Sequence, residues 1–195
     1  MPADAIRLFV AVALPPNTRD ALANVVHSLR EDLPGPFRWV APESLHLTLK
    51  FLGDVERGRV ELLTSALAAA CRDRDAFHLA LSGAGTFPGR GSPKVIWVGI
   101  GGDTGALAAL QRSVEAALVE AGEARQDNPF RPHLTLARVR ETLSPQAAAA
   151  LHERLQAVRF NAQEAFDVRS VGLMHSTLTP EGPIYRTLAE APLAG

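Results

Sequence analysis

The apolar positions at the start of the chain predict a strand and then a helix. Residues Ile6 to Leu14 are almost continuously apolar and end at Pro15, which is typical of a buried central strand. Apolar residues at helical spacing follow, and we expect Asn17 or Thr18 to cap this helix. Pro34 marks its end.

The rest of the first half alternates strand and helix signals. A short strand is expected at Phe37 to Val40, and a second strand begins at His46 and ends in a turn near Gly53. A helix with apolar residues at helical spacing from Val60 to Ala70 follows. These signals predict a first lobe with the element order β-α-β-β-α.

The second half repeats these element types without a break in composition. We expect two strands separated by a long Gly- and Pro-rich loop, a helix, a strand, a second helix and two closing strands. The ranges are Phe77 to Leu81, Ser82 to Pro93 for the loop, Lys94 to Gly99, Thr104 to Ala121, the strand from His133, Ser144 to Val158, Ala165 to His175 and Ile184 to Ala189. The second half therefore repeats the element types of the first as a pseudo-repeat, and we expect residues 1–195 to form a single domain.

One short pattern occurs in both halves, each time in a predicted strand. It reads His46-Leu47-Thr48-Leu49 in the first half and His133-Leu134-Thr135-Leu136 in the second. Side chains of a strand alternate between its faces, so the His and Thr of each copy share one face while the leucines point toward a core. If a pseudo-two-fold arrangement brings the strands together, two imidazoles and two hydroxyls line one groove. Such a groove offers a general acid, a general base and hydrogen-bond donors.

Composition narrows the class of protein. The chain has 195 residues, 47% hydrophobic, with 20 basic and 21 acidic residues and a net charge of −1, so any contact with RNA must be focal. The single Cys71 excludes a disulfide framework and suits a reducing compartment. No signal peptide or membrane-spanning apolar segment is found, so we expect a cytoplasmic protein without membrane contact.

Several candidate motifs for cofactors and metals fail. The glycines from Gly99 to Gly105 lie between a strand and a helix, but position 104 is Thr where a dinucleotide-binding turn needs its third glycine. The segment from Gly89 to Lys94 does not match a P-loop. His46 and His133 have no carboxylate or thiol at ligand-like spacing. We therefore expect neither a cofactor nor a metal.

The chain resembles the two-histidine (2H) phosphoesterases, and within them the RNA 2′,3′-cyclic phosphodiesterases, also called 2′-5′ RNA ligases. The stretches that carry the resemblance are Arg7 to Ala11, Trp39 to Gly53, Trp97 to Gly99, Phe130 to Arg138 and Pro180 to Tyr185. The resemblance implies an α+β fold of two lobes. In it, two antiparallel sheets face a central cleft, helices cover the outer faces, and the two H-x-T motifs meet in the cleft.

The resemblance also implies roles for five side chains. His46 is the expected proton donor and His133 the acceptor, although their near-symmetry leaves the order open. Thr48 and Thr135 would donate hydrogen bonds to the non-bridging phosphate oxygens. Arg138 would contact the phosphate with its planar fork. An ideal strand places this odd offset on the opposite face, so Arg138 reaches the site only if the strand twists, bulges or ends first.

We therefore predict a metal-independent hydrolase, a monomer, that opens RNA-terminal 2′,3′-cyclic phosphates to 2′-phosphates, with reversible 2′-5′ ligation as a side activity. Two alternatives stay open. The same site could act on a small cyclic phosphate, such as a cyclic nucleotide or ADP-ribose 1″,2″-cyclic phosphate. The chain could also be a non-catalytic binder of RNA ends. Candidates for stacking on a base are Phe9, Trp39, Phe87 and Tyr185.

Overall fold

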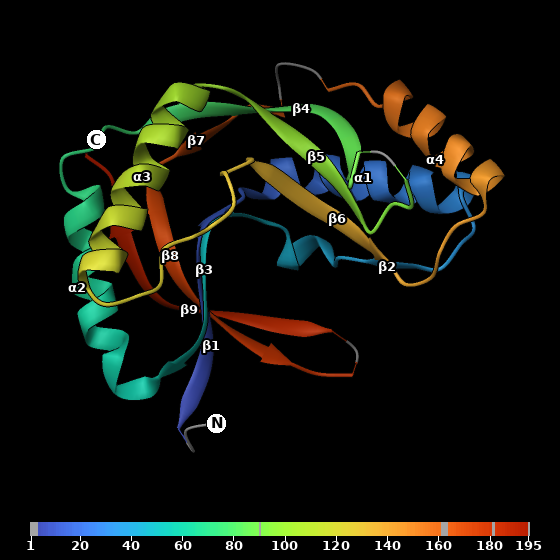
Figure 1. The fold of residues 1–195 in the computed structure, drawn as a ribbon. Coiled ribbons are helices and arrows are strands. Elements are labelled where there is room, and N and C mark those ends of the chain that lie inside the picture. The colour runs from blue at the N-terminus through green and yellow to red at the C-terminus, as the bar shows by residue number, and fades with distance from the viewer. Residues whose placement is uncertain (1–3, 90, 161–163, 181, 195) are drawn as a thin grey trace.

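Two antiparallel sheets lie side by side in the part of the chain that the computed structural model describes, residues 4–89, 91–160, 164–180 and 182–194 (Figure 1). Glu181, in the last stretch that carries the resemblance, lies outside these residues. One sheet, here the β1 sheet, has the order β3 (His46–Glu56), β1 (Ala5–Ala13), β8 (Ser170–Leu178), β9 (Pro183–Pro192). The other, the β6 sheet, has the order β2 (Phe37–Trp39), β6 (His133–Val139), β5 (Val95–Gly102), β4 (Phe77–Phe87), β7 (Phe166–Val168).

Helices pack on both sheets. Figure 1 shows α2 (Val60–Cys71) and α3 (Thr104–Glu120) beside the β1 sheet, and α1 (Pro16–Asp32) and α4 (Pro145–Ala157) beside the β6 sheet. Each turns a stripe of aliphatic side chains inward; in α1 these are Leu22, Val26 and Leu29. Within the described residues, no helix is long and apolar enough to cross a membrane. The predicted α+β class is confirmed.

The expectation that the first five elements form a lobe of their own is wrong. β2 leaves the first half of the chain to pair with β6, and β8 and β9 from the second half complete the β1 sheet. The helices also cross between the sheets. For example, α3 follows β5 of the β6 sheet along the chain but packs on β3 of the β1 sheet. Each lobe is therefore built from both halves of the chain.

Glycines account for two further differences from the expected strands. The predicted turn near Gly53 is part of β3, which continues to Glu56; Gly53 has φ +73° and stays paired opposite Leu8. The first half of the predicted loop from Ser82 to Pro93 belongs to β4, which runs to Phe87. Gly83, at φ +59°, lies where β4 carries a register shift. Glycine is read as a loop signal, but these glycines let a strand bend without ending.

Of two helix starts, that of α4 agrees with the expected range and that of α1 does not. Ser144 caps α4, since its Oγ accepts a hydrogen bond from the backbone N–H of Ala147 at 3.2 Å. α1 begins earlier than expected, after Pro15, with no side-chain cap. Asn17 and Thr18 therefore lie inside its first turn. Cys71 is buried, as expected of a packing residue.

Both H-x-T strands carry one extra residue directly after the motif's threonine. In β3, Thr48 lies opposite Ala11 and Lys50 opposite Val10, which leaves Leu49 as the insertion. In β6 the insertion is Leu136, because Thr135 lies opposite Trp97 and Ala137 lies opposite Ile96. Such a bulge shifts the alternation of side chains by one position. Lys50 and Ala137 are consequently buried beside the leucines, and the next residues, Phe51 and Arg138, turn to the exposed face.

The bulge in β3 creates a buried ion pair. Only 1% of the Lys50 side chain is exposed, and its Nζ donates to Glu115 Oε2 and to the carbonyl oxygen of Ala124, both at 2.7 Å. Glu115 Oε1 accepts from the backbone N–H of Gln126 at 2.8 Å. Burial opposes ionisation of Glu115, but the hydrogen bonds from Lys50 and Gln126 and nearby positive charge leave its pKa lowered. The pair joins β3 and α3 to the segment that leads into β6.

We expect Glu115→Gln to lower the free energy of unfolding by about 3–5 kcal/mol, because it leaves the Lys50 ammonium buried without its counter-charge. The double variant Lys50→Met/Glu115→Leu removes both charges and should recover most of the loss. Urea denaturation at neutral pH measures both. A single variant as stable as the native chain would show that the pair does not support this junction.

Candidate active site

The ring of His46 is oriented by the backbone just before it. His46 opens β3 directly after a 3₁₀ turn at Pro42–Ser44, and its Nδ1 lies 2.7 Å from the carbonyl oxygen of Ser44. A carbonyl oxygen can only accept a hydrogen bond, so Nδ1 carries the proton. In the neutral ring, Nε2 then holds the free lone pair.

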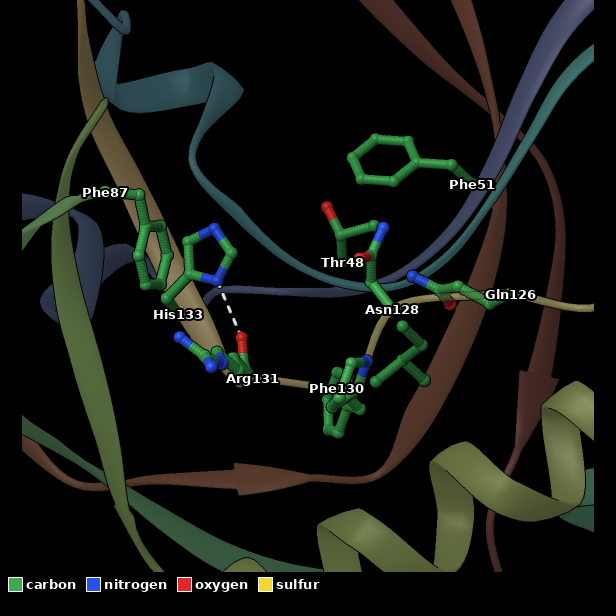
Figure 2. A pocket seen from close by; sticks show the side chains of 10 residues that line it. Thr48, Phe51, Phe87, Gln126, Asn128, Phe130, Arg131 and His133 are labelled. Carbon is green, nitrogen blue, oxygen red and sulfur yellow. Dashed lines mark hydrogen bonds between the residues drawn. The ribbon is translucent and has the colours of Figure 1, made fainter. Parts of the chain in front are cut away.

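His133 repeats this arrangement in the other sheet. It opens β6, and its Nδ1 lies 2.7 Å from the carbonyl oxygen of Arg131, again two residues earlier (Figure 2). The same reasoning assigns the proton to Nδ1 and leaves Nε2 free. Each imidazole thus presents the nitrogen that can accept a proton when neutral and donate one when charged.

Aromatic rings hold both imidazoles in place. The His46 ring lies 4.8 Å from that of Phe9 and meets Tyr185 edge-on at 5.0 Å. The His133 ring meets Phe87 edge-on at 5.0 Å. Burial lowers the pKa of His46 below its usual 6.5, and the hydrogen bond to the Ser44 carbonyl opposes this only in part. In the free protein, His46 therefore favours the neutral form at pH 7.

One cleft contains residues of both H-x-T motifs. Its volume is about 540 Å³, and Thr48 of β3 and His133 of β6 both line it (Figure 2). The remaining lining residues are Leu49, Phe51, Phe87, Gln126, Asn128, Pro129, Phe130 and Arg131. Since β3 and β6 belong to different sheets but contact one another, the cleft lies where the sheets meet. His46 and Thr135 are not among its lining residues.

Thr135 and Arg138 lie on the same face of β6 as His133. Thr135 is two residues after His133, in the part of β6 where alternation is regular, and it pairs opposite Trp97. The extra Leu136 then reverses the parity, which moves Arg138 onto this face. Its charge also acts on the hydroxyl of Tyr185, the residue packed on His46. The condition set for Arg138, a bulge between it and the motif, is therefore met.

The four leucines of the motifs point away from the cleft side of their strands, as expected. Leu47, Leu49, Leu134 and Leu136 are all at most 1% exposed and belong to the hydrophobic core. Leu49 also borders the cleft, at the position of the bulge.

Sequence reasoning missed Phe51 and the segment before His133. Phe51 is 66% exposed and lines the cleft, although an exposed aromatic residue three positions after Thr48 contradicts strict alternation. That contradiction was the available signal for a bulge. The segment from Gln126 to Arg131 had no periodic signal and is held by Glu115.

The four proposed base-stacking residues fall into different places. Phe87 lines the cleft, whereas Tyr185 packs edge-on against His46 and is not among the lining residues. Phe9 is only 3% exposed beneath the His46 ring, which leaves little of its face for a base. Trp39 pairs opposite the buried Ala137 and lies under the guanidinium of Arg30 from α1, so it packs on the other face of the β6 sheet.

The arrangement can transfer protons and hold an anion. Two imidazoles with free Nε2 atoms supply the acid and the base, while threonine hydroxyls and a guanidinium supply donors to negatively charged oxygens. In the residues that the structure describes, His, Cys, Asp and Glu side chains form no cluster of three or more that could hold a metal ion.

The comparisons with known proteins agree on one family. The model of the 2′-5′ RNA ligase superfamily matches residues 18–179. The RNA 2′,3′-cyclic phosphodiesterase of Methanothermobacter thermautotrophicus is 33% identical over 92% of this chain and 95% of its own. A solved protein of Thermus thermophilus matches 97% of this chain and 99% of its own, with TM-score 0.81 and 29% identity. The structure of Escherichia coli LigT with 3′-AMP matches 98% of this chain and 99% of its own, with TM-score 0.76 and 26% identity.

We expect His46 to titrate below pH 6.5 in the free protein, because the surrounding aromatic rings exclude water from its charged form. Tyr185→Ser opens this environment and should move the midpoint upward, toward 6.5. Histidine proton signals followed by NMR against pH measure both. His27, exposed on α1, serves as the internal control. A His46 midpoint at or above 6.5 in the native chain would contradict the role of burial.

Proposed function

We propose that this chain, which belongs to the 2′-5′ RNA ligase superfamily, is an RNA 2′,3′-cyclic phosphodiesterase that opens the terminal ring to a 2′-phosphate. The observation that carries the mechanism is the matched orientation of His46 and His133. Each ring donates from Nδ1 to the carbonyl oxygen two residues earlier, which leaves Nε2 for the reacting proton. Thr48 and His133 share one cleft, so groups from both motifs reach one ligand.

The reaction needs one proton taken and one given. His133, as the base, removes a proton from water while the water oxygen bonds to phosphorus. The bond from phosphorus to the ribose 3′ oxygen breaks, and His46 donates its Nε2 proton to that oxygen. The products are a 2′-phosphate and a free 3′ hydroxyl. The order of the two histidines follows the family resemblance.

His46 must gain a proton to act as the donor. Burial favours its neutral form in the free protein. The cyclic phosphate carries one negative charge, and a nearby opposite charge raises the pKa of an imidazole. Binding of the substrate therefore favours the charged form that the reaction needs.

The threonines and Arg138 act on the other phosphate oxygens. Negative charge builds on the non-bridging oxygens in the transition state, and hydroxyl donors fixed on strands stabilise it without reorganising. Thr48 lines the cleft, and Thr135 and Arg138 occupy the same face of β6 as His133. Proton transfer and these donors suffice for hydrolysis without a Lewis acid. When the 5′ hydroxyl of a second RNA attacks the cyclic phosphate in place of water, the bond from phosphorus to the 3′ oxygen breaks in the same way. The same groups then support 2′-5′ ligation, which leaves a 2′-5′ phosphodiester and a free 3′ hydroxyl.

His46→Ala and His133→Ala should each lower kcat by about 10²–10⁴, the range for losing a general acid or base. An oligonucleotide that ends in a 2′,3′-cyclic phosphate is the substrate, excess chelator is present throughout, and the product is identified as 2′-phosphate. His27→Ala is the matched control on the surface of α1. A near-normal rate in either motif variant would refute the two-imidazole mechanism. Loss of native activity in chelator, restored by one divalent ion, would refute its independence of metal.

A sulfur substitution separates the acid from the base. Replacing the bridging 3′ oxygen of the cyclic phosphate by sulfur gives a thiolate leaving group, which departs without being protonated. If His46 is the donor, the defect of His46→Ala should shrink at least about tenfold on this substrate, while that of His133→Ala persists. The opposite pattern would exchange the two roles.

A further inference from the structure

Arg38 and Arg138 lie side by side at the outer end of the β6 sheet. Arg38 of the edge strand β2 is the direct antiparallel partner of Arg138 of β6. Directly opposed residues project from the same face, and like charges in such a pair destabilise a sheet. Among the described residues, neither guanidinium has an ion-pair or hydrogen-bond partner. Two adjacent cations of this kind favour binding of an anion.

The face that carries the pair is the face of the active site. The bulge at Leu136 places Arg138 on the side of His133 and Thr135, and Arg38 follows because it pairs with Arg138. Both positive charges also act on the Tyr185 hydroxyl, whose ring packs on His46. The two arginines therefore extend the site outward, toward the edge of the sheet.

The Arg38 side chain lies beside a turn of the other lobe. Its Nη2 lies 3.3 Å from where a Cβ of Gly182 would stand, so the guanidinium lies against the backbone of the β8–β9 turn. This turn is itself closed by hydrogen bonds, since the Thr179 hydroxyl donates to the Gly182 carbonyl oxygen at 2.7 Å. In Figure 1 the arms of the β8–β9 hairpin extend from the β1 sheet to the side on which β2 lies.

We propose that Arg38, beside Arg138, binds the phosphodiester next to the terminal cyclic phosphate of an RNA chain. This inference rests on the proposed function. Thr48, Thr135 and Arg138 already supply donors to the reacting phosphate, and Arg38 is one strand farther out, about 4.8 Å away. β2 is an edge strand, so a nucleic-acid chain can continue past it into solvent. A mononucleotide has no second phosphate to occupy this position, and an oligonucleotide does.

Arg38→Gln is the test, with two substrates that share the same 3′-terminal nucleoside. One is a nucleoside 2′,3′-cyclic phosphate without a 5′ phosphate, and the other is an oligonucleotide ending in that nucleotide. We expect kcat/KM to fall about tenfold or more for the oligonucleotide, the effect of losing a charged hydrogen bond. The value for the mononucleotide should change less than about twofold, because its only phosphate lies at the histidines.

Two further variants distinguish a phosphate contact from a general effect of charge. Arg38→Lys keeps the charge but loses the fork, so we expect a smaller loss and an unchanged salt dependence. Arg38→Gln should instead reduce the slope of log KM against log salt by about one. Arg112→Gln, which removes an exposed charge from α3 on the outer side of the β1 sheet, should alter neither substrate.

Each result decides between distinct statements. An equal loss of kcat/KM on both substrates would place Arg38 at the reacting phosphate or in a structural role. No loss on either substrate would show that the arginine pair does not bind RNA. Either result would overturn the inference. A native chain that turns over neither substrate would instead refute the proposed function. Thermal unfolding of Arg38→Gln, expected at or above the native temperature because the variant removes a like-charge pair, confirms that the kinetic loss is not a folding defect.

Discussion

A single inserted residue after the threonine of each H-x-T motif determines which side chains β3 and β6 turn to the cleft and to the core. If the two strands ran without a bulge at Leu49 and Leu136, regular alternation would send Lys50 and Ala137 to the cleft and the residues after them to the core. With the bulges, Lys50 is buried against Glu115 while Phe51 and Arg138 reach the cleft face. The chemistry of the site and the attachment of α3 therefore depend on the same local distortion.

The exchange of elements between the lobes keeps the two motifs in register. β2 comes from the first half of the chain but pairs with β6, and β8 and β9 come from the second half but pair with β1 and each other. Lys50 adds a connection, because its partners Glu115 and Ala124 lie in α3 and in the segment leading to His133. Neither sheet can form from one half of the chain alone. The geometry of the site is consequently a property of the whole fold, which explains why the motifs can be so far apart in sequence.

The sequence was informative where one local rule decided the outcome. Alternation alone placed the four motif leucines in the core, and Ser144 before Pro145 marked the start of α4. It was not informative where two rules competed. Gly53 and Gly83 have the backbone freedom of turn residues, yet ladder pairing on both sides keeps them within strands. Arg138 was undecided for the same reason, because alternation opposed a role that only the pairing register of β5 and β6 could permit. No local pattern in the sequence shows that β2 pairs with β6, so the sequence alone could not place Arg38 beside Arg138.

The pseudo-symmetry holds for the proton-transfer geometry and fails for what surrounds it. Both histidines hydrogen-bond to a carbonyl two residues earlier and meet an aromatic ring edge-on. Two residues after the bulge, however, β3 has Phe51 where β6 has Arg138, and Phe9 packs against the His46 ring as a second aromatic neighbour. Acid–base catalysis by two identical groups needs their environments to differ, since one must hold a proton while the other lacks it. The surroundings of the two rings differ, and burial lowers the pKa of His46, so the donor role proposed for His46 depends on the negative charge of the bound substrate. The surroundings also give the cleft a direction, because the arginine pair extends from the β6 side and the exposed Phe51 lies on the β3 side. A nucleotide has the same polarity, with a charged phosphate at one end and an apolar base face at the other, so under the proposed function this asymmetry orients the substrate in the cleft.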